Sequence, residues 1–352
     1  MPTREELKML QALPLDIKIR KTQQRIREWV EYYGEDGVYV SFSGGKDSTV
    51  LLDIARNAYP GIEAVFVNTG LEYPEIVDFV KRFDNVTILR PKKNFKQVLT
   101  EYGYPVISKE ISQSIYEARI QIKNGLKNCY RMQKLNGILK DKNGNLSQYN
   151  IPQWKFLLNA PFKISHMCCD NMKKKPFKMY EKSEKKFPIL GMLGSESFLR
   201  QQTWERYGCN AFDLKRPQSN PLSFWTNNDI LAYIHTYSLP IASVYGDVVP
   251  DDKGQLPGQT NIYDMLGEYQ GCKFKTTGCE RTGCMFCLFG AHLEKGAGRL
   301  ERMKRTHPKR YGYVMGGGEF NNEGMWIPNN KGLGFKFVVD WLNENGNMNI
   351  KY

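Results

Sequence analysis

The sequence predicts an α/β protein: a parallel twisted sheet with helices on both faces, followed by an irregular, cysteine-rich C-terminal segment. Three observations support this fold class. Between residues 35 and 90, short β-rich apolar segments alternate with segments of helical spacing, which is typical of parallel sheets. The length of 352 residues allows about two domains. Beyond residue 240 the chain is rich in Gly and Pro and loses periodicity, and four of the eight cysteines lie between residues 272 and 287.

The N-terminal region, residues 4–33, sets spaced apolar residues among charges and is followed by Gly34, so we expect one helix there. Elsewhere, short apolar β-rich runs predict strands, and apolar spacing of three or four residues predicts helices. By these rules we expect strands at 38–42, 64–68, 86–89 and 188–192, and helices at 49–56, 74–83 and 226–234.

The chain therefore divides into three expected regions. Residues 1–34 form an N-terminal helical segment, residues 35–240 an α/β domain, and residues 241–352 the cysteine-rich region. A polar stretch rich in Asn, Lys and Gly indicates an insertion in the α/β domain at about 124–160. We find no internal repeat and no low-complexity tract.

The composition is typical of a globular protein, with 41% hydrophobic and 25% charged residues. No apolar run approaches the ~20 residues of a membrane helix, and the charged N-terminus contains no signal segment. We therefore expect a cytoplasmic protein without a membrane partner. Fifty basic residues against 37 acidic ones give a net charge of +13, which predicts phosphates, nucleotides or nucleic acid as partners.

The segment from Ser43 to Thr49, SGGKDST, connects an expected strand to an expected helix. Two glycines let the backbone curl so that its N–H groups point inward. The helix N-terminus, the hydroxyls and Lys46 add donors and positive charge. This pattern predicts an anion cradle, although it lacks the spacing of a Walker A loop. The alternative is an ordinary Gly-Gly turn.

This loop resembles the pyrophosphate loop of the ATP pyrophosphatases, also called adenine nucleotide α-hydrolases. Within that superfamily, the chain is identified as a member of the phosphoadenylyl-sulfate (PAPS) reductase family. Asn68 stands where that family more often has Asp, and Leu193 stands where a basic residue is common. The other segments that resemble family motifs, in the same order along the chain, are residues 67–75, 168–176, 191–200, 221–226 and 283–287.

The cysteines fall into two pairs and several others. In adenylyl-sulfate reductases of this family, a Cys-Cys pair and a distant Cys-x-x-Cys hold a 4Fe–4S cluster, so the resemblance implies Cys168, Cys169, Cys284 and Cys287 as ligands. Four thiolates also suit zinc. A local site formed by Cys284 and Cys287 with Cys272 and Cys279 is a further alternative, as is a set of buried cysteines without a ligand.

The chemistry assigns roles to the nucleotide-site candidates. Backbone N–H groups of Ser43, Gly44, Gly45, Lys46 and Asp47, with the Lys46 charge, would stabilise a departing pyrophosphate. Asp47 is a candidate ligand for Mg²⁺. Ser48 and Thr49 would cap the helix and touch phosphate.

Two further segments follow predicted strands, where parallel sheets bind ligands. The first is Asn68, Thr69 and Gly70, with Glu72 nearby, and the second contains Ser195, Glu196, Ser197 and Arg200. Arg200 could contact phosphate in a bidentate manner; the alternative is an internal salt bridge with Glu196. We place Lys46, Asp47 and Arg200 as the catalytic candidates.

Reductases of the family carry a C-terminal Glu-Cys-Gly-(Leu or Ile)-His motif whose cysteine is the nucleophile. This sequence has no cysteine after Cys287. We therefore expect ATP as the nucleotide, cleaved to AMP and pyrophosphate to adenylate a substrate for sulfur transfer. The alternatives are a reductase of PAPS or adenylyl sulfate that takes its thiol from Cys279 or a reductant protein, and an iron–sulfur regulator without turnover.

Partners beyond the nucleotide are predicted from charge and chemistry. Basic tracts at 173–186 and 299–310, the second followed by Tyr311 and Tyr313, are typical of nucleic-acid binding, so nucleic acid is a candidate acceptor. The alternative is a solvated helix face. A sulfur-donor protein is also expected. His166 and His292 lie near the proposed cluster ligands in sequence, either as hydrogen-bonding supports or as ordinary core or surface residues.

Overall fold

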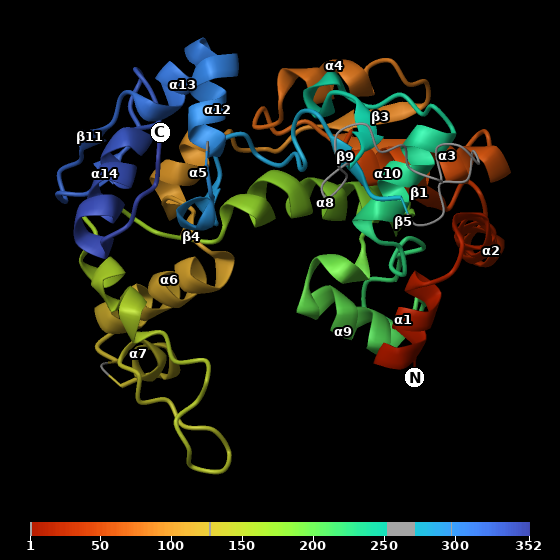
Figure 1. Cartoon of the computed structure of the whole chain (residues 1–352). Coiled ribbons are helices and arrows are strands. Elements are labelled where there is room, and N and C mark those ends of the chain that lie inside the picture. The colour runs from red at the N-terminus through yellow and green to blue at the C-terminus, as the bar shows by residue number, and fades with distance from the viewer. Residues whose placement is uncertain (1, 127, 252–271, 297) are drawn as a thin grey trace, which may run out of the picture. The chain divides into compact units, whose positions relative to one another are not determined.

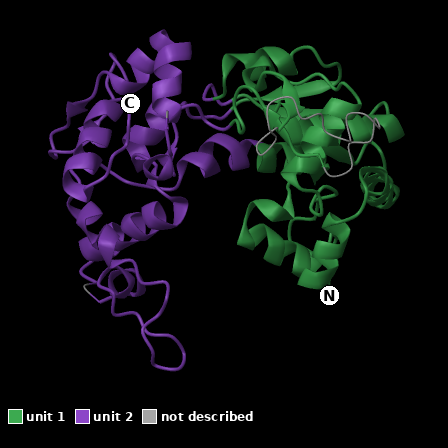
Figure 2. Cartoon of the chain, viewed as in Figure 1, with its two compact units in different colours: residues 1–68, 72–90, 177–282 green, residues 69–71, 91–176, 283–352 purple. Residues whose placement is uncertain are grey.

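The structure is a computed structural model that describes residues 2–126, 128–251, 272–296 and 298–352. The chain forms two compact units that are interleaved along the sequence (Figure 2). Unit 1 contains residues 1–68, 72–90 and 177–282, and unit 2 contains residues 69–71, 91–176 and 283–352. The sequence analysis drew contiguous regions instead. The expected C-terminal region includes residues 252–271, which lie outside the described part of the chain.

Unit 1 is built on a six-stranded sheet in the order β3-β2-β1-β5-β7-β6. All its strands are parallel except β6, which pairs antiparallel with β7. The predicted fold class and the four predicted strands are confirmed. The strands are β1 (Val38–Ser41), β2 (Ala64–Val67), β3 (Val86–Leu89), β5 (Phe187–Leu190), β6 (Asn210–Ala211) and β7 (Gln218–Ser219).

The N-terminal region forms two helices, α1 (Arg4–Gln11) and α2 (Leu15–Tyr33), where the sequence analysis expected one. The break falls before Pro14, because proline has no N–H for the helical ladder and disfavours helical backbone at the residue before it. The remaining helices and strands of unit 1 are α3 (Lys46–Ala58), α4 (Pro74–Val80), α8 (Lys175–Glu184, in unit 1 from Phe177), η3 (Gly194–Glu196), α9 (Phe198–Tyr207), α10 (Asn227–Thr236), η4 (Ser243–Tyr245), β8 (Val248–Pro250) and β9 (Phe274–Thr276).

Helices cover the sheet of unit 1 (Figure 1). Helices α2 and α10 both pack against α3, and α3 in turn packs against β1. Tyr39 of β1 and Val65 of β2 form a buried cluster with Tyr180 of α8. The chain passes from β1 through α3 to β2 on one side, whereas β5 pairs with the other side of β1. The carboxyl ends of β1 and β5 therefore flank a topological switch point, where such sheets bind ligands.

Unit 2 is organised around the short segment from Tyr104 to Ile107. Tyr104 forms a parallel bridge with Ile164, and β4 (Val106–Ile107) pairs in parallel with β10 (Leu288–Phe289). The Tyr104 N–H donates to Lys163 O at 2.8 Å, and the Gly290 N–H donates to Ile107 O at 2.8 Å. One segment thus ties together stretches that are far apart in sequence. These stretches precede Cys168 and follow Cys287.

The C-terminal part of the chain is more regular than its composition indicated, because three helices and a hairpin follow residue 298. Helix α12 is strongly charged, and only Leu300 and Met303 are buried, which explains why no apolar periodicity was apparent. The elements of unit 2 are α5 (Phe95–Tyr102), β4, α6 (Lys109–Lys123), α7 (Tyr130–Leu135), η1 (Pro152–Asn159), η2 (Asp170–Lys174), β10, η5 (Ala291–Leu293), α12 (Arg299–Thr306), α13 (Pro308–Met315), β11 (Glu319–Phe320), β12 (Trp326–Ile327) and α14 (Phe335–Gly346).

Among the described residues, every helix is too short or too polar to cross a membrane.

Candidate functional site

The loop between β1 and α3 has the backbone that an anion cradle requires. Gly44 has φ +69°, and a Cβ atom there would lie 2.7 Å from Val80 Cγ2 and 2.8 Å from Ile76 Cγ2. A side chain at Gly44 would therefore be strained and would clash. Helix α3 begins at Lys46, three residues earlier than expected, so Lys46 and Asp47 stand in its first turn. The N-terminal end of α3 consequently faces the carboxyl edge of the sheet.

Hydroxyl groups inside the loop hold several of its backbone groups. The Ser43 N–H donates to Ser48 Oγ at 3.1 Å, and the Gly45 N–H donates to Ser43 Oγ at 3.3 Å. Ser48 and Thr49 hydroxyls both donate to Gly45 O, at 2.9 and 3.0 Å. The hydroxyls of Ser48 and Thr49 thus stabilise the turn at the start of α3 by binding its backbone.

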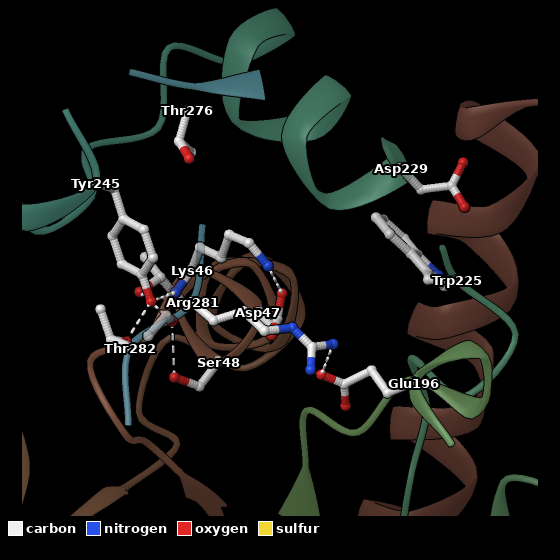
Figure 3. Close-up of polar contacts among 12 residues, drawn as sticks. Lys46, Asp47, Ser48, Glu196, Trp225, Asp229, Tyr245, Thr276, Arg281 and Thr282 are labelled. Atoms are coloured by element: carbon white, nitrogen blue, oxygen red, sulfur yellow. Dashed lines mark hydrogen bonds and ion pairs between the residues drawn. The ribbon is translucent and has the colours of Figure 1, made fainter. Parts of the chain in front are cut away.

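Lys46 and Asp47 form an ion pair at the start of α3. The ammonium Nζ of Lys46 lies 2.7 Å from Asp47 Oδ1, and the Lys46 residue is only 3% exposed (Figure 3). Burial of a charged ammonium is costly without a nearby anion. An anionic ligand at this loop would compete with Asp47 for the ammonium, or would bind alongside the pair with a divalent cation. The Lys46 ammonium can therefore become a partner of a phosphate group bound at the loop.

Tyr245 contacts the loop and was missed by the sequence analysis. Its hydroxyl accepts a hydrogen bond from the Lys46 backbone N–H at 3.2 Å and lies 2.5 Å from Thr282 Oγ1 (Figure 3). Gly45 lies close to this hydroxyl, since a Cβ there would be 3.3 Å away. Tyr245 stands 199 residues after Lys46 in an aperiodic region, so no local pattern could have indicated the contact.

Glu196 binds two arginines in the same unit. The Arg200 guanidinium pairs with Glu196. Arg281 Nη2 lies 2.8 Å from Glu196 Oε1 (Figure 3). The salt-bridge alternative for Arg200 is therefore observed. Burial lowers the pKa of Arg200, the neighbouring charge of Arg281 lowers it further, and the Asp47 carboxylate acts in the opposite direction. Asp47 and Arg200 are thus close enough to interact, which places Arg200 beside the loop.

The other expected nucleotide contacts have local structural partners. Ser195 Oγ donates to Trp225 O at 3.3 Å, and Ser197 caps α9 by accepting from the Arg200 N–H. The Asn68 N–H donates to Leu89 O at 2.9 Å, which continues the β2–β3 pairing. Thr69 Oγ1 accepts from the Leu71 N–H, and Gly70 has φ +76°. Asn68 and Glu72 belong to unit 1, whereas Thr69 and Gly70 belong to unit 2.

Unit 2 contains a pocket that brings both cysteine pairs together. Cys168, Cys169, Cys284 and Cys287 all line it. The Sγ atoms of Cys168 and Cys169 lie 4.0 Å apart, just before the π-helical turn η2. The other lining residues are Leu71, Phe95, Pro105, Met172, Lys173 and Phe286.

The cysteine pocket favours a thiolate at Cys169. The Cys168 S–H group donates to Cys169, and this lowers the pKa of Cys169 to about 6, with help from the nearby charges of Lys109 and Lys173. The same hydrogen bond, together with burial, raises the pKa of Cys168. Burial also raises the pKa of Cys287. A cationic centre in the pocket would stabilise the thiolate form of every ligand.

Within residues 2–126, 128–251, 272–296 and 298–352, no group of three or more His, Cys, Asp or Glu side chains is arranged to hold a metal ion. This applies both to the cysteines of the pocket and to the surroundings of Asp47.

The remaining cysteines and the two histidines lie elsewhere or serve locally. Cys272 packs with Leu231 and Phe274, and Cys279 is buried; both belong to unit 1. His166 and His292 each have a buried Nδ1 without a hydrogen-bond partner among the described residues. Their rings pack against Tyr116 and Trp154 respectively.

Part of the basic surface is used in internal ion pairs. Lys174 pairs with Asp170, Lys186 with Glu63, and Arg299 with Glu294. Lys304 lies over the Tyr311 ring at 5.5 Å from its centroid. These contacts support the solvated-face alternative for some members of the two basic tracts.

Comparisons with known proteins give a family match over much of the chain. The model of the phosphoadenosine phosphosulfate reductase domain matches residues 37–288. An uncharacterized protein of Methanocaldococcus jannaschii is 40% identical over 73 residues, which cover 19% of this chain and only 18% of that protein.

Three solved structures show weak similarity. The PAPS reductase of Candida auris has a TM-score of 0.35 at 14% identity and covers 73% of this chain and 98% of its own. The FMN adenylyltransferase of Candida glabrata has a TM-score of 0.36 at 12% identity, covering 72% of each chain. The NH3-dependent NAD synthetase of Campylobacter jejuni has a TM-score of 0.33 at 14% identity, covering 64% and 75%. Scores of this size support no conclusion about activity.

Proposed function

Because the chain belongs to the phosphoadenosine phosphosulfate reductase domain family, we propose that it is a nucleotide-dependent enzyme that cleaves ATP to AMP and pyrophosphate. In this proposal the AMP moiety is transferred to a substrate oxygen, which activates the substrate for sulfur transfer. The observation that carries the proposal is the loop of residues 43–49. It combines a left-handed glycine, a helix N-terminus and a buried lysine at the carboxyl end of β1.

The proposed chemistry assigns separate roles to the loop residues. The substrate oxygen attacks the α-phosphorus, and the bond between that phosphorus and the oxygen bridging to the β-phosphorus breaks. The leaving pyrophosphate takes the electron pair of that bond. Loop N–H groups and the Lys46 ammonium lie where they can stabilise the negative charge that develops. Asp47 would hold Mg²⁺ against the same phosphates once Lys46 turns from the carboxylate to the ligand.

Arg200 is proposed to support the transferred phosphate group. It lies close enough to Asp47 for their charges to interact, and it remains paired with Glu196. A guanidinium that is already oriented by a carboxylate can still present its other N–H groups to phosphate oxygens.

The cysteine pocket is proposed to hold a 4Fe–4S cluster through Cys168, Cys169, Cys284 and Cys287. Its support is that the two pairs line one pocket. When bound, such a cluster would crosslink the two cysteine pairs and order the chain around it. The protein's own contribution is a thiolate at Cys169 and a partly apolar shell formed by Phe95, Met172 and Phe286.

Reduction of PAPS or adenylyl sulfate is the second candidate. The observation that favours it is the family match, because the matching family is described as a phosphoadenosine phosphosulfate reductase domain. In this alternative the same loop binds a sulfonucleotide. A thiol from Cys279 or a partner protein attacks its sulfur and displaces the nucleotide, which leaves a sulfo group on the thiol. A second thiol then forms a disulfide with the first and releases sulfite, so that the two thiols supply the two electrons.

One experiment separates the candidates. The protein is purified anaerobically and incubated with ATP, with adenylyl sulfate plus thiol, and with PAPS plus thiol, and both pyrophosphate and sulfite are measured. Pyrophosphate from ATP that is lost in Lys46→Met and Asp47→Asn supports the proposal. Asp53→Asn on the same helix is the matched control, because Asp53 binds Tyr233 at 2.6 Å instead of facing the loop.

The other results of that experiment are also decisive. Sulfite release without pyrophosphate would overturn the proposal in favour of the reductase. Tight nucleotide binding with neither product, in the presence of nucleic-acid acceptors and a sulfide source, would indicate a regulator without turnover.

A further inference from the structure

Unit 1 contains a cavity that is separate from the phosphate loop. The proposed function assigns no ligand to it. The cavity has a volume of about 200 Å³ and is bounded by α9, by the end of β7 and by the segment after β5. Pockets that take drug-sized ligands measure ~300–1,000 Å³. A cavity of this size therefore suits a smaller group, such as a single heterocycle.

Asn220 is a buried polar residue in the wall of the cavity. This residue is only 5% exposed, and its Oδ1 atom is buried without a hydrogen-bond partner among the described residues. Its backbone is fully used, because the Asn220 N–H donates to Cys209 O and its carbonyl accepts from the Ser223 N–H. A buried acceptor without a partner costs stability. It is expected to persist where a ligand supplies the missing donor.

Apart from Arg200, the remaining wall residues are uncharged, and several are apolar. Met192, Leu199 and Trp204 supply apolar surface, and Gln218 adds a second amide beside Asn220. Thr203 contributes a hydroxyl whose proton is already donated to Leu199 O at 2.9 Å. Amide side chains among aromatic and thioether groups are the environment in which proteins recognise the hydrogen-bonding edge of a nucleobase.

Arg200 connects this cavity to the phosphate loop. It lines the cavity, and its charge interacts with Asp47 at the start of α3. The backbone brings the two places together as well, because a Cβ on Gly191 would lie 3.3 Å from Asp47 O and the next residue, Met192, lines the cavity. A group bound in the cavity would therefore lie next to the position where the α-phosphate of a bound nucleotide is expected. That is the arrangement required when the group in the cavity accepts the adenylate.

We propose that this cavity is the acceptor site and that it takes a nucleobase, whose amino or ring N–H group donates to Asn220. This inference rests on the proposed function, because it names the substrate class that the adenylation would act upon. The base would come from a nucleoside or from a flexible, unpaired position of a nucleic acid, because a stacked base is not accessible.

Binding of uridine and cytidine to the full-length protein tests the inference, with ATP present at saturation so that the nucleotide site is occupied. Equilibrium dialysis is measured for the wild type, Asn220→Leu, Thr203→Trp and Gln201→Leu. We expect at least a tenfold loss of affinity in Asn220→Leu and no detectable binding in Thr203→Trp, which fills the cavity. Gln201→Leu is the control, because Gln201 lies on the same helix but pairs with Glu205 at 2.8 Å and does not line the cavity.

The melting temperature distinguishes a ligand-binding role of the Asn220 side chain from a structural one. Asn220→Leu replaces an unpaired buried acceptor by an apolar group of similar size, so we expect an unchanged or higher melting temperature. A marked fall would show that the amide supports the fold and would overturn the inference. Absence of nucleoside binding to the wild type would overturn it as well.

The two proposals fail differently. Pyrophosphate release from ATP without any nucleoside binding leaves the proposed function standing and removes the acceptor site. Nucleoside binding that depends on Asn220, without ATP cleavage, supports a nucleobase-binding site in the cavity but overturns its role as the acceptor of adenylate.

Discussion

The hydroxyl of Tyr245 accepts a hydrogen bond from the backbone N–H of Lys46, at 3.2 Å, at the first residue of α3. Tyr245 is only 2% exposed, and Thr282 lies at 2.5 Å from the same oxygen. A tyrosine hydroxyl thus occupies a helix N-terminal donor that the sequence analysis assigned to a phosphate. The simplest consequence is an exchange, in which a phosphate oxygen takes the place of the tyrosine oxygen.

Tyr245→Phe tests this exchange. Without nucleotide, the variant leaves the Lys46 N–H without its partner, and we expect a loss of about 1–2 kcal/mol in the free energy of unfolding. With saturating ATP the phosphate supplies the acceptor, so the loss should become smaller. The increase in melting temperature on adding ATP should therefore be larger in Tyr245→Phe than in the wild type, as measured by differential scanning fluorimetry.

The control for this variant is Tyr233→Phe. Tyr233 is also a buried tyrosine that binds α3, but through Asp53 at 2.6 Å, away from the loop. Its removal should lower stability equally with and without ATP. Equal ATP-induced increases in all three proteins would show that no phosphate replaces the Tyr245 hydroxyl.

Gly44→Ala should abolish nucleotide binding. The substitution forces a Cβ atom onto a residue at φ +69° and into contact with Val80 and Ile76. Because both the conformation and the contact are unfavourable, we expect a loss of about 2–3 kcal/mol in stability and an undetectable ATP-induced shift in melting temperature.

Gly34→Ala is the control for Gly44→Ala, because it introduces backbone strain without a steric clash. Gly34 ends α2 at φ +80°, and nothing lies within 4 Å of the position of its added Cβ. This variant should lose about 1–3 kcal/mol, because φ +80° with ψ 155° is a backbone conformation that essentially only glycine adopts. It should bind ATP like the wild type, and a loss of ATP binding in this variant would mean that general destabilisation explains the Gly44 result.

The strands of the sheet could be predicted from sequence because they are short, continuous and apolar. Strand β3 matches its expected bounds, 86–89, and β1, β2 and β5 begin or end within two residues of theirs. Every residue of β2 is buried, which gives the apolar run that marks a central parallel strand. The loop at Gly44 was equally visible because its glycines and lysine are adjacent in sequence.

The parts that sequence could not predict depend on contacts between distant segments. The Tyr104–Ile107 segment brings the two cysteine pairs to one pocket through two strand-like pairings, yet β4 has only two residues and no recognisable pattern. Tyr245 contacts the loop, and Arg281 contacts Glu196, also across long stretches of sequence. Such contacts follow from tertiary packing, which local propensity and periodicity do not encode.

Arg200 and Arg281 should differ in function although both bind Glu196. The Arg200 side chain is 39% exposed and interacts with the charge of Asp47, whereas the Arg281 side chain is 66% exposed. We expect Arg200→Ala to reduce kcat for pyrophosphate release at least 100-fold, because a charge that stabilises the transferred phosphate is lost. Arg281→Ala should reduce it less than tenfold, since an exposed ion pair contributes little. Equal losses in the two variants would show that Arg200 serves only the salt bridge.

Replacing the cysteines one at a time should identify the ligand set. We expect anaerobically purified wild type to contain about four irons and four sulfides per chain, as a 4Fe–4S cluster requires. Cys168→Ser, Cys169→Ser, Cys284→Ser and Cys287→Ser should each lose most of the iron, because these four line the same pocket. Cys272→Ser and Cys279→Ser should keep it, since neither residue lines that pocket.

Two results would contradict the assignment in different ways. If Cys272→Ser and Cys279→Ser lose iron while Cys168→Ser and Cys169→Ser retain it, the late cysteines form a local site of their own. Stoichiometric zinc without sulfide in the wild type would mean that the pocket closes around a single ion. That closure would require the thiols to move, because no three of the described His, Cys, Asp or Glu side chains are now arranged to bind one.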